Sequence, residues 1–175
     1  MRESMNPMVE RLHEIDWNAW VPEWRATLLF IVRDEQVLLI HKKTGFGRGK
    51  INAPGGRIEP GESAREAAIR EVQEEVCVTP LDVENCGTLY FQFLDGFTLY
   101  GEVFRAAAFE GQPSETEEAK PFWNSIHRMP YDQMWADDRY WVPHLFAGRP
   151  FVGRFLFDGE TMMEHDVQIV NRCFQ

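Results

Sequence analysis

The sequence predicts an α/β fold in which helices pack on both faces of a mixed β-sheet, an α/β/α sandwich. Apolar, β-branched segments separated by turn residues predict several strands. Two other segments predict helices that pack on the resulting sheet. Because 44% of the 175 residues are hydrophobic, the chain can bury a substantial core, and we expect one domain over residues 1–175.

The first part of the chain predicts an extension, a hairpin and a loop. Residues 1–24 contain three tryptophans and are expected to form an irregular or helical N-terminal extension. The apolar segments 26–32 and 37–43 flank the turn sequence RDEQ, which predicts a β-hairpin. Residues 44–56, TGFGRGKINAPGG, hold five glycines and a proline and therefore predict a loop.

A helix is predicted over residues 64–76. Ser63 suits the N-cap position, and Glu66, three residues later, completes a capping box. The sequence TPLD after Val78 is expected to end this helical region. Three apolar residues at four-residue spacing are expected to face the core: Ala68, Val72 and Val76.

The remainder of the chain predicts strands and one more helix. Two long antiparallel strands are expected within residues 87–111, on either side of the turn Asp95-Gly96. A short strand follows at 121–125, then a second helix within 131–148 and a final hairpin within 151–170.

Charge and composition exclude several classes of protein. The net charge of −10 repels polyanions and argues against a protein that binds duplex nucleic acid. The chain has no apolar run long enough to span a membrane, and its first residues lack the apolar core of a signal peptide. The cysteines, Cys77, Cys86 and Cys173, form no CxxC pair, which favours reduced thiols over a zinc site. We therefore expect a cytoplasmic location.

The predicted helix carries an unusual cluster of carboxylates. Glu71, Glu74 and Glu75 stand at i, i+3 and i+4 and are expected to share a polar face away from the apolar stripe. A divalent cation would relieve their mutual repulsion, and hard oxygen ligands suit Mg²⁺ or Mn²⁺. Arg70 precedes the cluster and is positioned either to orient a glutamate or to restrain the glycine-rich segment PGGRIEPGE, residues 54–62. The competing interpretation is a solvated acidic helix face.

This stretch resembles the signature of the Nudix hydrolases. The signature requires a glycine, a glutamate six residues later, and then an Arg-Glu pair followed by Glu-Glu and a terminal Gly-aliphatic pair. The matching residues are Gly56, Glu62, Arg70, Glu71, Val72, Glu74, Glu75 and Val78. Cys77 departs from the pattern, because it stands where the family has the glycine that ends the helix in a left-handed conformation.

The resemblance implies hydrolysis of a nucleoside diphosphate linked to another group. It implies that the metal ligands are the Gly55 carbonyl, Glu71 and Glu75, with Glu74 nearby as a ligand or a water-binding group. Glu118 stands where family members supply a further acidic ligand from a loop. The base that activates the attacking water stays open between Glu71 and Glu75.

A second resemblance concerns the substrate. Residues 42–56 and 129–146 are similar to the loop and helix of the animal MutT-homologue branch, which hydrolyses oxidised purine nucleoside triphosphates; the similarity extends over about residues 26–170. It implies that Asn52, Asp137 and Asp138 read the purine and that Trp135 stacks on it. It also implies that Lys42 closes the pocket or meets the nucleotide. The residues expected to line the pocket are Thr27, Phe46, Phe91 and Phe93. Ile51 and Pro54 stand where the branch has aromatic residues, which predicts a wider pocket.

The adjacent aspartates also have a physical interpretation of their own. In an aromatic pocket, desolvation and mutual repulsion should raise the pKa of Asp137 or Asp138, so that one carboxyl stays protonated and donates a hydrogen bond. The alternative is that both are solvated at a helix N-terminus. Trp135 offers a broad π-face for a base, whereas Trp141 is expected to be a core residue.

Three functions remain open at this point. The leading hypothesis is a diphosphatase that converts oxidised purine nucleoside triphosphates to monophosphate and pyrophosphate. A second is a Nudix hydrolase of RNA 5′ ends, dinucleoside polyphosphates or nucleotide sugars. A third is a non-catalytic Nudix domain that senses a nucleotide, against which the intact glutamates argue. The sequence leaves the oligomeric state and the selectivity for oxidised bases undetermined.

Overall fold

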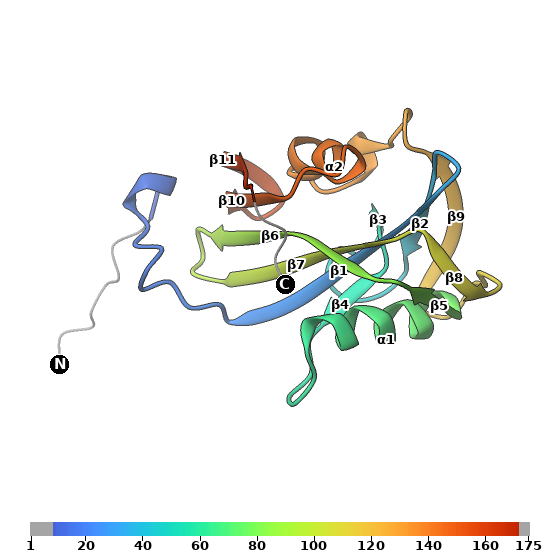
Figure 1. Ribbon diagram of the computed structural model, residues 1–175. Helices are drawn as coiled ribbons and strands as arrows, with labels where there is room; N and C mark the ends of the chain where they lie inside the picture. Colours follow the sequence, from blue (N-terminus) through green and yellow to red (C-terminus); the bar gives the residue numbers. More distant parts are fainter. Residues whose placement is uncertain (1–8, 172–175) are drawn as a thin grey trace.

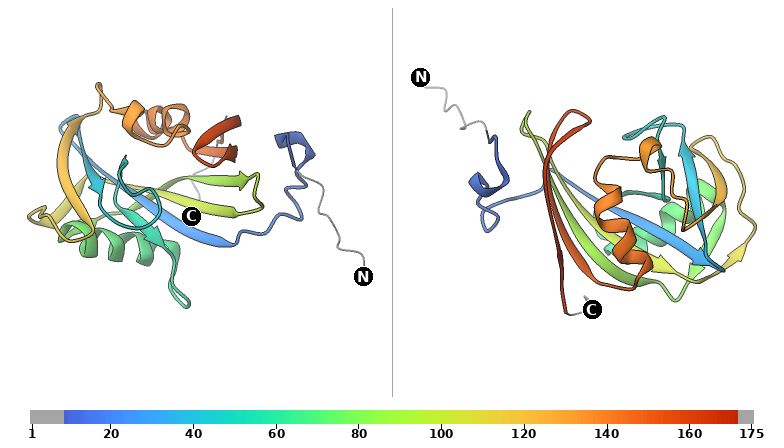
Figure 2. Two further views of the ribbon diagram at one scale, coloured as in Figure 1. Left: turned by 180° about the vertical axis from the view of Figure 1, so that it is seen from behind. Right: turned by 90° about the horizontal axis from the view of Figure 1, so that it is seen from above.

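The computed structural model describes residues 9–171 (Figure 1). Within this range, nine strands form one mixed sheet, in which the main path is β11-β10-β6-β7-β1-β2-β3, while β4 pairs with β1 and β9 pairs with β2. Helices α1 and α2 lie on opposite faces of this sheet (Figures 1 and 2). The predicted α/β/α sandwich with a mixed sheet is therefore confirmed.

The strand and helix boundaries follow the turn and cap residues. The strands are β1 (Trp24–Arg33), β2 (Gln36–Lys42), β3 (Ile51–Asn52), β4 (Gly55–Arg57), β5 (Val78–Leu81), β6 (Glu84–Phe93), β7 (Thr98–Ala106), β8 (Ala108–Gly111), β9 (Ala119–Ser125), β10 (Phe151–Asp158) and β11 (Thr161–Ile169). The helices are α1 (Ala64–Val76) and α2 (Asp138–Phe146), with short 3₁₀ turns η1 (Leu12–Glu14) and η2 (Tyr131–Gln133). No helix in this part of the chain is both long and apolar enough to cross a bilayer.

The predicted hairpins are confirmed, and three local predictions are corrected. Asp34 and Glu35 take positive φ angles of 51° and 60° in the tight turn between β1 and β2. The segment predicted as a loop contains β3 and β4, because β2 and β1 supply hydrogen-bond partners that are distant in sequence. The TPLD segment forms β5 and pairs with β8. The second predicted helix is confirmed only at 138–146, after the 3₁₀ turn.

Each face of the sheet has its own core. Ala68, Val72 and Val76 of α1 pack on residues such as Leu29 and Ile31 of β1, which confirms the predicted apolar stripe. On the other face, Trp141 and Leu145 of α2 pack on Phe30, Phe151 and Phe155. Successive side chains of β1 point to opposite faces, so one strand serves both cores. The polar residues of α1 and of the start of α2 border one cavity, which is the candidate site.

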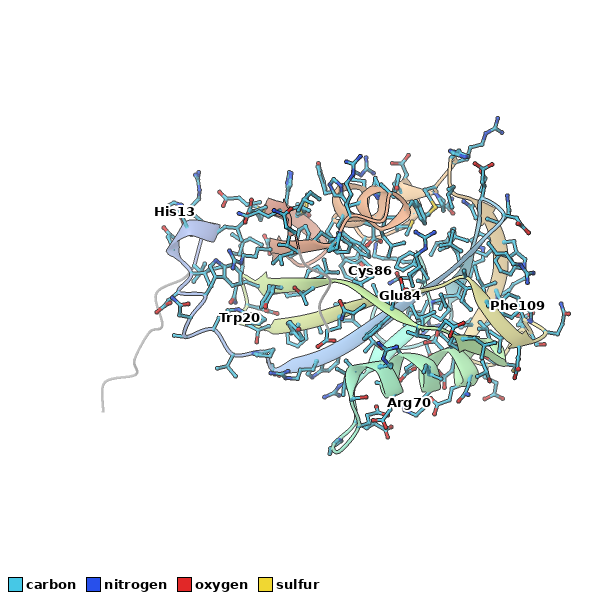
Figure 3. All side chains as sticks on the ribbon, in the orientation of Figure 1. His13, Trp20, Arg70, Glu84, Cys86 and Phe109 are labelled. Atoms are coloured by element: carbon cyan, nitrogen blue, oxygen red, sulfur yellow. The ribbon has the colours of Figure 1, made fainter. Side chains whose placement is uncertain are left out.

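The N-terminal extension continues into the sheet. Trp24 belongs to β1, and the extension before it lies at the opposite end of the sheet from β9 (Figures 1 and 2). Trp17 and Trp20 contact the ring of Tyr90 edge-on, at centroid distances of 6.0 and 5.4 Å. Trp20, labelled in Figure 3, also donates a 3.1 Å hydrogen bond from Nε1 to Oε1 of Gln92. The extension therefore covers sheet surface beyond α1. Its first eight residues lie outside the described residues.

Candidate active site

Helix α1 begins and ends as its sequence predicts. The Ser63 hydroxyl accepts from the Glu66 N–H at 3.2 Å, and the Glu66 carboxylate accepts from the Ser63 N–H at 2.7 Å. At the other end, Cys77 takes the left-handed conformation, with φ 64° and ψ 23°, that the family assigns to glycine. Its N–H donates to the Gln73 carbonyl at 3.1 Å. The cysteine therefore preserves the helix end at the cost of a strained backbone.

The competing interpretation, a solvated acidic face that carries all three glutamates, is wrong, because the three side chains differ in burial. Glu75 is fully buried at the contact between α1 and β4. Glu75 Oε1 accepts from the Gly55 N–H at 3.2 Å, whereas Oε2 has no hydrogen-bond partner among the described residues. Desolvation raises the pKa of Glu75 to about 7. Glu71 is half-buried and Glu74 lies on the surface.

Arg70, labelled on α1 in Figure 3, links this helix to the glycine-rich segment 54–62. Its guanidinium donates to Glu62 at 2.5 and 3.0 Å, to Glu71 at 2.9 Å and to Glu74 at 3.2 Å. It also donates to the Arg57 carbonyl at 3.0 Å. The bond from Arg70 lowers the pKa of Glu62 to about 2. Arg70 thus both orients a glutamate and restrains the loop, the two roles that the sequence left open.

The two glycines of β4 allow the loop to touch α1. A Cβ at Gly56 would lie 2.4 Å from the Glu71 carboxylate, and a Cβ at Gly55 would lie 2.0 Å from the Thr27 carbonyl. Neither position can hold a side chain without displacing its neighbours. The glycines therefore bring the backbone against both the helix carboxylate and the central strand.

A cavity of about 360 Å³ opens beside this loop. It is enclosed by the central strands, by α1 on one side and by the start of α2 on the other. Among the residues predicted for the site, these line it: Thr27, Lys42, Phe46, Asn52, Gly55, Glu71, Glu75, Phe91, Phe93, Glu118, Trp135, Asp137 and Asp138. Arg70 and Glu74 are not among the lining residues. One cavity therefore connects the helix glutamates with the predicted base-reading residues.

Asp137 and Asp138 are both buried, each with 2% of its surface exposed. Trp141 Nε1 donates to Oδ2 of Asp137 at 2.8 Å, whereas Asp137 Oδ1 and Asp138 Oδ2 have no partner in the described chain. Desolvation raises the pKa of Asp137 to about 6. Desolvation and the charge of Asp137 raise the pKa of Asp138 well above its ordinary value. The solvated interpretation of this pair is wrong, and burial raises both pKa values rather than one.

Comparison with known proteins identifies the family. A model of the NUDIX domain matches residues 22–145. The chain belongs to the Nudix family. It is 39% identical over 146 residues to an oxidized purine nucleoside triphosphate hydrolase of Danio rerio, which covers 82% of this chain and 94% of that protein. The Mus musculus protein of the same name is 33% identical over 147 residues, covering 83% and 94%.

A solved structure shows the same Nudix fold. The MutT protein from Bacillus halodurans superposes with a TM-score of 0.75 at 28% sequence identity. The superposition covers 82% of this chain and 97% of the other. The family predicted from the signature and the branch predicted from the second resemblance are confirmed, while the roles of individual residues remain predictions.

The residues of the Nudix helix fit a divalent cation. Glu75 buries an oxygen without a partner, and the Gly55 carbonyl, Glu71 and Glu118 border the same cavity. The charges of Glu71 and Glu118 both raise the pKa of Glu75, as expected of carboxylates that a cation would neutralise. In residues 9–171, however, no three His, Cys, Asp or Glu side chains converge into a preformed metal site. The candidate metal ligands are carboxylate and carbonyl oxygens, which suit a divalent cation. Arg70 holds one of these ligands, Glu71, by a hydrogen bond.

Aromatic side chains form one wall of the Nudix cavity. Phe46 stacks on Trp135 with a centroid distance of 5.1 Å and an interplanar angle of 10°. Lys50 places its Nζ 4.9 Å from the centre of the Trp135 ring. Trp141 is fully buried in the core, as predicted, and also holds Asp137. Ile51 lies in the core on the α2 side of the sheet, and neither Ile51 nor Pro54 lines the cavity. The effect of these two residues on the width of the pocket stays a prediction.

The sequence interpretation missed several lining residues. Trp24, Leu99, Gly101 and Glu102 all border the cavity. The predicted hairpin around Asp95-Gly96 contained the necessary signal, because antiparallel pairing sets Leu99 opposite Phe91. Residues that pair across two strands point to the same face. Cys77 is exposed at the end of α1 and forms no disulfide bond with another described residue. Cys173 lies outside the described residues, so the reduced state of the three thiols stays a prediction.

Proposed function

We propose that this Nudix protein hydrolyses oxidised purine nucleoside triphosphates to the monophosphate and pyrophosphate. One observation supports this most directly: a single cavity joins the half-buried and buried glutamates of α1 to a buried aspartate pair with an aromatic wall. The first group suits a metal-bound polyphosphate, and the second suits a purine. The named relatives from Danio rerio and Mus musculus support the same substrate class.

The aspartate pair would read the base. Asp137 and Asp138 leave one oxygen each without a partner inside the cavity, and Asn52 lines it from β3. With raised pKa values, the pair presents donor and acceptor groups near neutral pH. Trp135 offers a ring face against which the purine can stack. This arrangement would orient the base and direct the triphosphate toward α1.

The glutamates of α1 would act at the phosphates. Gly55, Glu71, Glu75 and Glu118 would hold Mg²⁺ or Mn²⁺, which supplies charge neutralisation at the phosphate oxygens when bound. Glu71 and Glu75 are the two α1 carboxylates that border the cavity, so either is placed to take the proton of an attacking water. Glu74 would bind ions or water from the surface. We place this reaction in the cytoplasm, where nucleotide pools and reduced thiols are found.

Pyrophosphate release from a panel of nucleotides tests the proposal. The panel contains 8-oxo-dGTP, 2-hydroxy-dATP, dGTP, a dinucleoside polyphosphate and a nucleotide sugar, each with Mg²⁺. We expect turnover of the oxidised purine triphosphates and loss of that turnover in Glu71→Gln. Turnover of only the dinucleoside polyphosphate or the sugar would reassign the substrate. Binding of nucleotides without turnover of any would indicate a sensing domain.

A further inference from the structure

The sheet floor of the cavity has a notch at Gly101. Along β7, Leu99, Gly101 and Val103 point to the same face, and all three border the cavity. Gly101 pairs with Ala26 on one neighbouring strand and with Leu89 on the other. Leu99, Val103 and Leu89 therefore surround Gly101, which has no side chain. Ala26, beside Gly101 on β1, adds only a methyl group.

Neither backbone geometry nor packing requires a glycine at this position. Gly101 does not have a positive φ angle, so a residue with a side chain could adopt its conformation. A Cβ at Gly101 would meet only the Cβ of Leu89, at 3.7 Å, which is an ordinary contact. By contrast, a Cβ at Gly153 or Gly87 would lie 2.6 Å from a phenylalanine ring, so packing explains those two glycines.

Glycine inside a strand weakens the strand, and it often marks a place where a ligand approaches closely. A second observation indicates that a ligand enters this cavity. Asp137 Oδ1 and Asp138 Oδ2 are unpartnered atoms of side chains that are only 2% exposed, and both residues line the same cavity. They come from the start of α2, whereas Gly101 belongs to the sheet beneath (Figure 1). A ligand read by the aspartates has room for additional atoms toward the sheet.

We propose that Gly101 determines the size of the base that this enzyme accepts. The notch admits purine nucleoside triphosphates with an apolar substituent larger than a methyl group on an exocyclic atom of the base. This inference rests on the proposed function, since it assumes that the aspartates read a purine. The flanking Leu99, Val103 and Leu89 give the substituent an apolar contact surface.

Two substitutions fill the notch to different extents. Gly101→Ala adds one methyl group, and Gly101→Val adds a branched side chain that reaches the space beside Ala26. Ala108→Val is the matched control, because Ala108 is an exposed β8 residue that does not line the cavity. Thermal unfolding of each variant shows whether the fold is kept, and Gly101→Ala serves if Gly101→Val does not fold.

The experiment measures kcat/KM for dATP and for its N6-methyl, N6-propyl and N6-benzyl derivatives, with 8-oxo-dGTP as reference. We expect the wild type and Ala108→Val to accept the whole series. In Gly101→Val, the ratio of N6-benzyl to unsubstituted dATP should fall by about tenfold to a hundredfold, the scale on which an apolar pocket discriminates by size. Gly101→Ala should show a smaller fall in the same direction.

The outcomes separate this inference from the proposed function. If the wild type hydrolyses no purine triphosphate, both are overturned. If it hydrolyses 8-oxo-dGTP but rejects the propyl and benzyl derivatives, only the role of the notch is overturned. The same holds if the substituted series is accepted but folded Gly101→Val and Gly101→Ala leave the benzyl ratio unchanged.

Discussion

Trp141 Nε1 donates a 2.8 Å hydrogen bond to Oδ2 of Asp137, and both side chains are almost completely buried. This bond opposes the effect of desolvation, because it lowers the pKa of Asp137 that burial raises. This hydrogen bond therefore connects a core residue, Trp141, with a residue of the candidate base pocket, Asp137.

Trp141→Phe should make stability depend more steeply on pH. The substitution removes the donor to Asp137, and an unsatisfied buried group costs about 1–3 kcal/mol. The loss in the free energy of unfolding should be larger at pH 7.5, where a charged Asp137 lacks its partner, than at pH 5, where it is protonated. Urea unfolding at both pH values measures this difference. The double variant with Asp137→Asn is the control, and an equal loss at both pH values would contradict the prediction.

Asp137→Asn and Asp138→Asn should impair base recognition more than phosphate chemistry. An amide fixes the donor and acceptor and removes the proton that the pair can shift. We expect each change to lower kcat/KM for 8-oxo-dGTP and 2-hydroxy-dATP by about one to two decades, at about 1.4 kcal/mol per decade. A dinucleoside polyphosphate and dGTP, assayed in parallel, provide the comparison. Equal losses on all substrates would mean that the aspartates have a structural role only.

The aspartate pair should destabilise the fold as pH rises. The pKa of Asp137 is raised from 3.8 to about 6, and that of Asp138 is also raised, so the native state holds more protons than the unfolded state between about pH 4 and pH 6. The contribution of the pair to the free energy of unfolding should fall across that range, by about 1.4 kcal/mol for each pH unit and each extra proton that the pair holds in the native state. Denaturation of the wild type and of the variant with both Asp→Asn changes, from pH 4.5 to 7.5, measures it. A wild type that gains as much stability with rising pH as the double variant would exclude the effect.

Glu75→Gln should abolish turnover while stabilising the metal-free protein. General-base loss alone lowers the rate by about 10²–10⁴. Because burial raises the pKa of Glu75 to about 7, the neutral amide should increase the free energy of unfolding at pH 8 in EDTA, by about 1–3 kcal/mol. Added Mg²⁺ should raise the Tm of the wild type and not that of the variant. Glu74→Gln, at the surface, is the matched control. Wild-type turnover by Glu75→Gln would refute the site assignment.

Cys77→Gly should stabilise the protein without changing its activity. Cys77 holds a φ of 64°, which a glycine adopts without strain, so we expect a gain of about 1 kcal/mol in the free energy of unfolding. Cys77→Ala keeps the Cβ and should show no such gain. Chemical denaturation of the three proteins distinguishes them. A glycine variant that is less stable than the wild type would mean that the thiol makes contacts worth more than the strain.

Local signals in the sequence predicted much of the fold. Helix α1 was predictable because its cap, its apolar repeat and its end all lie within a few residues of one another. The turn between β1 and β2 defined its hairpin for the same reason. Strand β5 was missed because its partner, β8, lies about thirty residues further along the chain, so pairing rather than local propensity decides its structure.

The site was predictable only where chemistry is encoded locally. The glutamate spacing and the family signature pointed to α1, but the burial of Glu75 depends on Gly55, which is twenty residues earlier. A helical wheel describes α1 alone and cannot show what covers it. The burial of Asp137 and Asp138 likewise depends on tertiary packing, and the resemblance to a known branch supplied what the residues alone left open. The register of the predicted hairpin could have placed Gly101 beside Leu99 on the cavity face, but a residue without a side chain suggested no role in the site.

The two faces of strand β6 contact different parts of the molecule. Phe91 points into the cavity, while the next residue on either side points to the opposite face, where the N-terminal extension packs on Tyr90 and bonds to Gln92. None of residues 9–23 lines the cavity, so the extension can change in length or composition without replacing a residue of the cavity wall. This surface is therefore a place where the chain can carry an additional segment while the cavity wall keeps its residues.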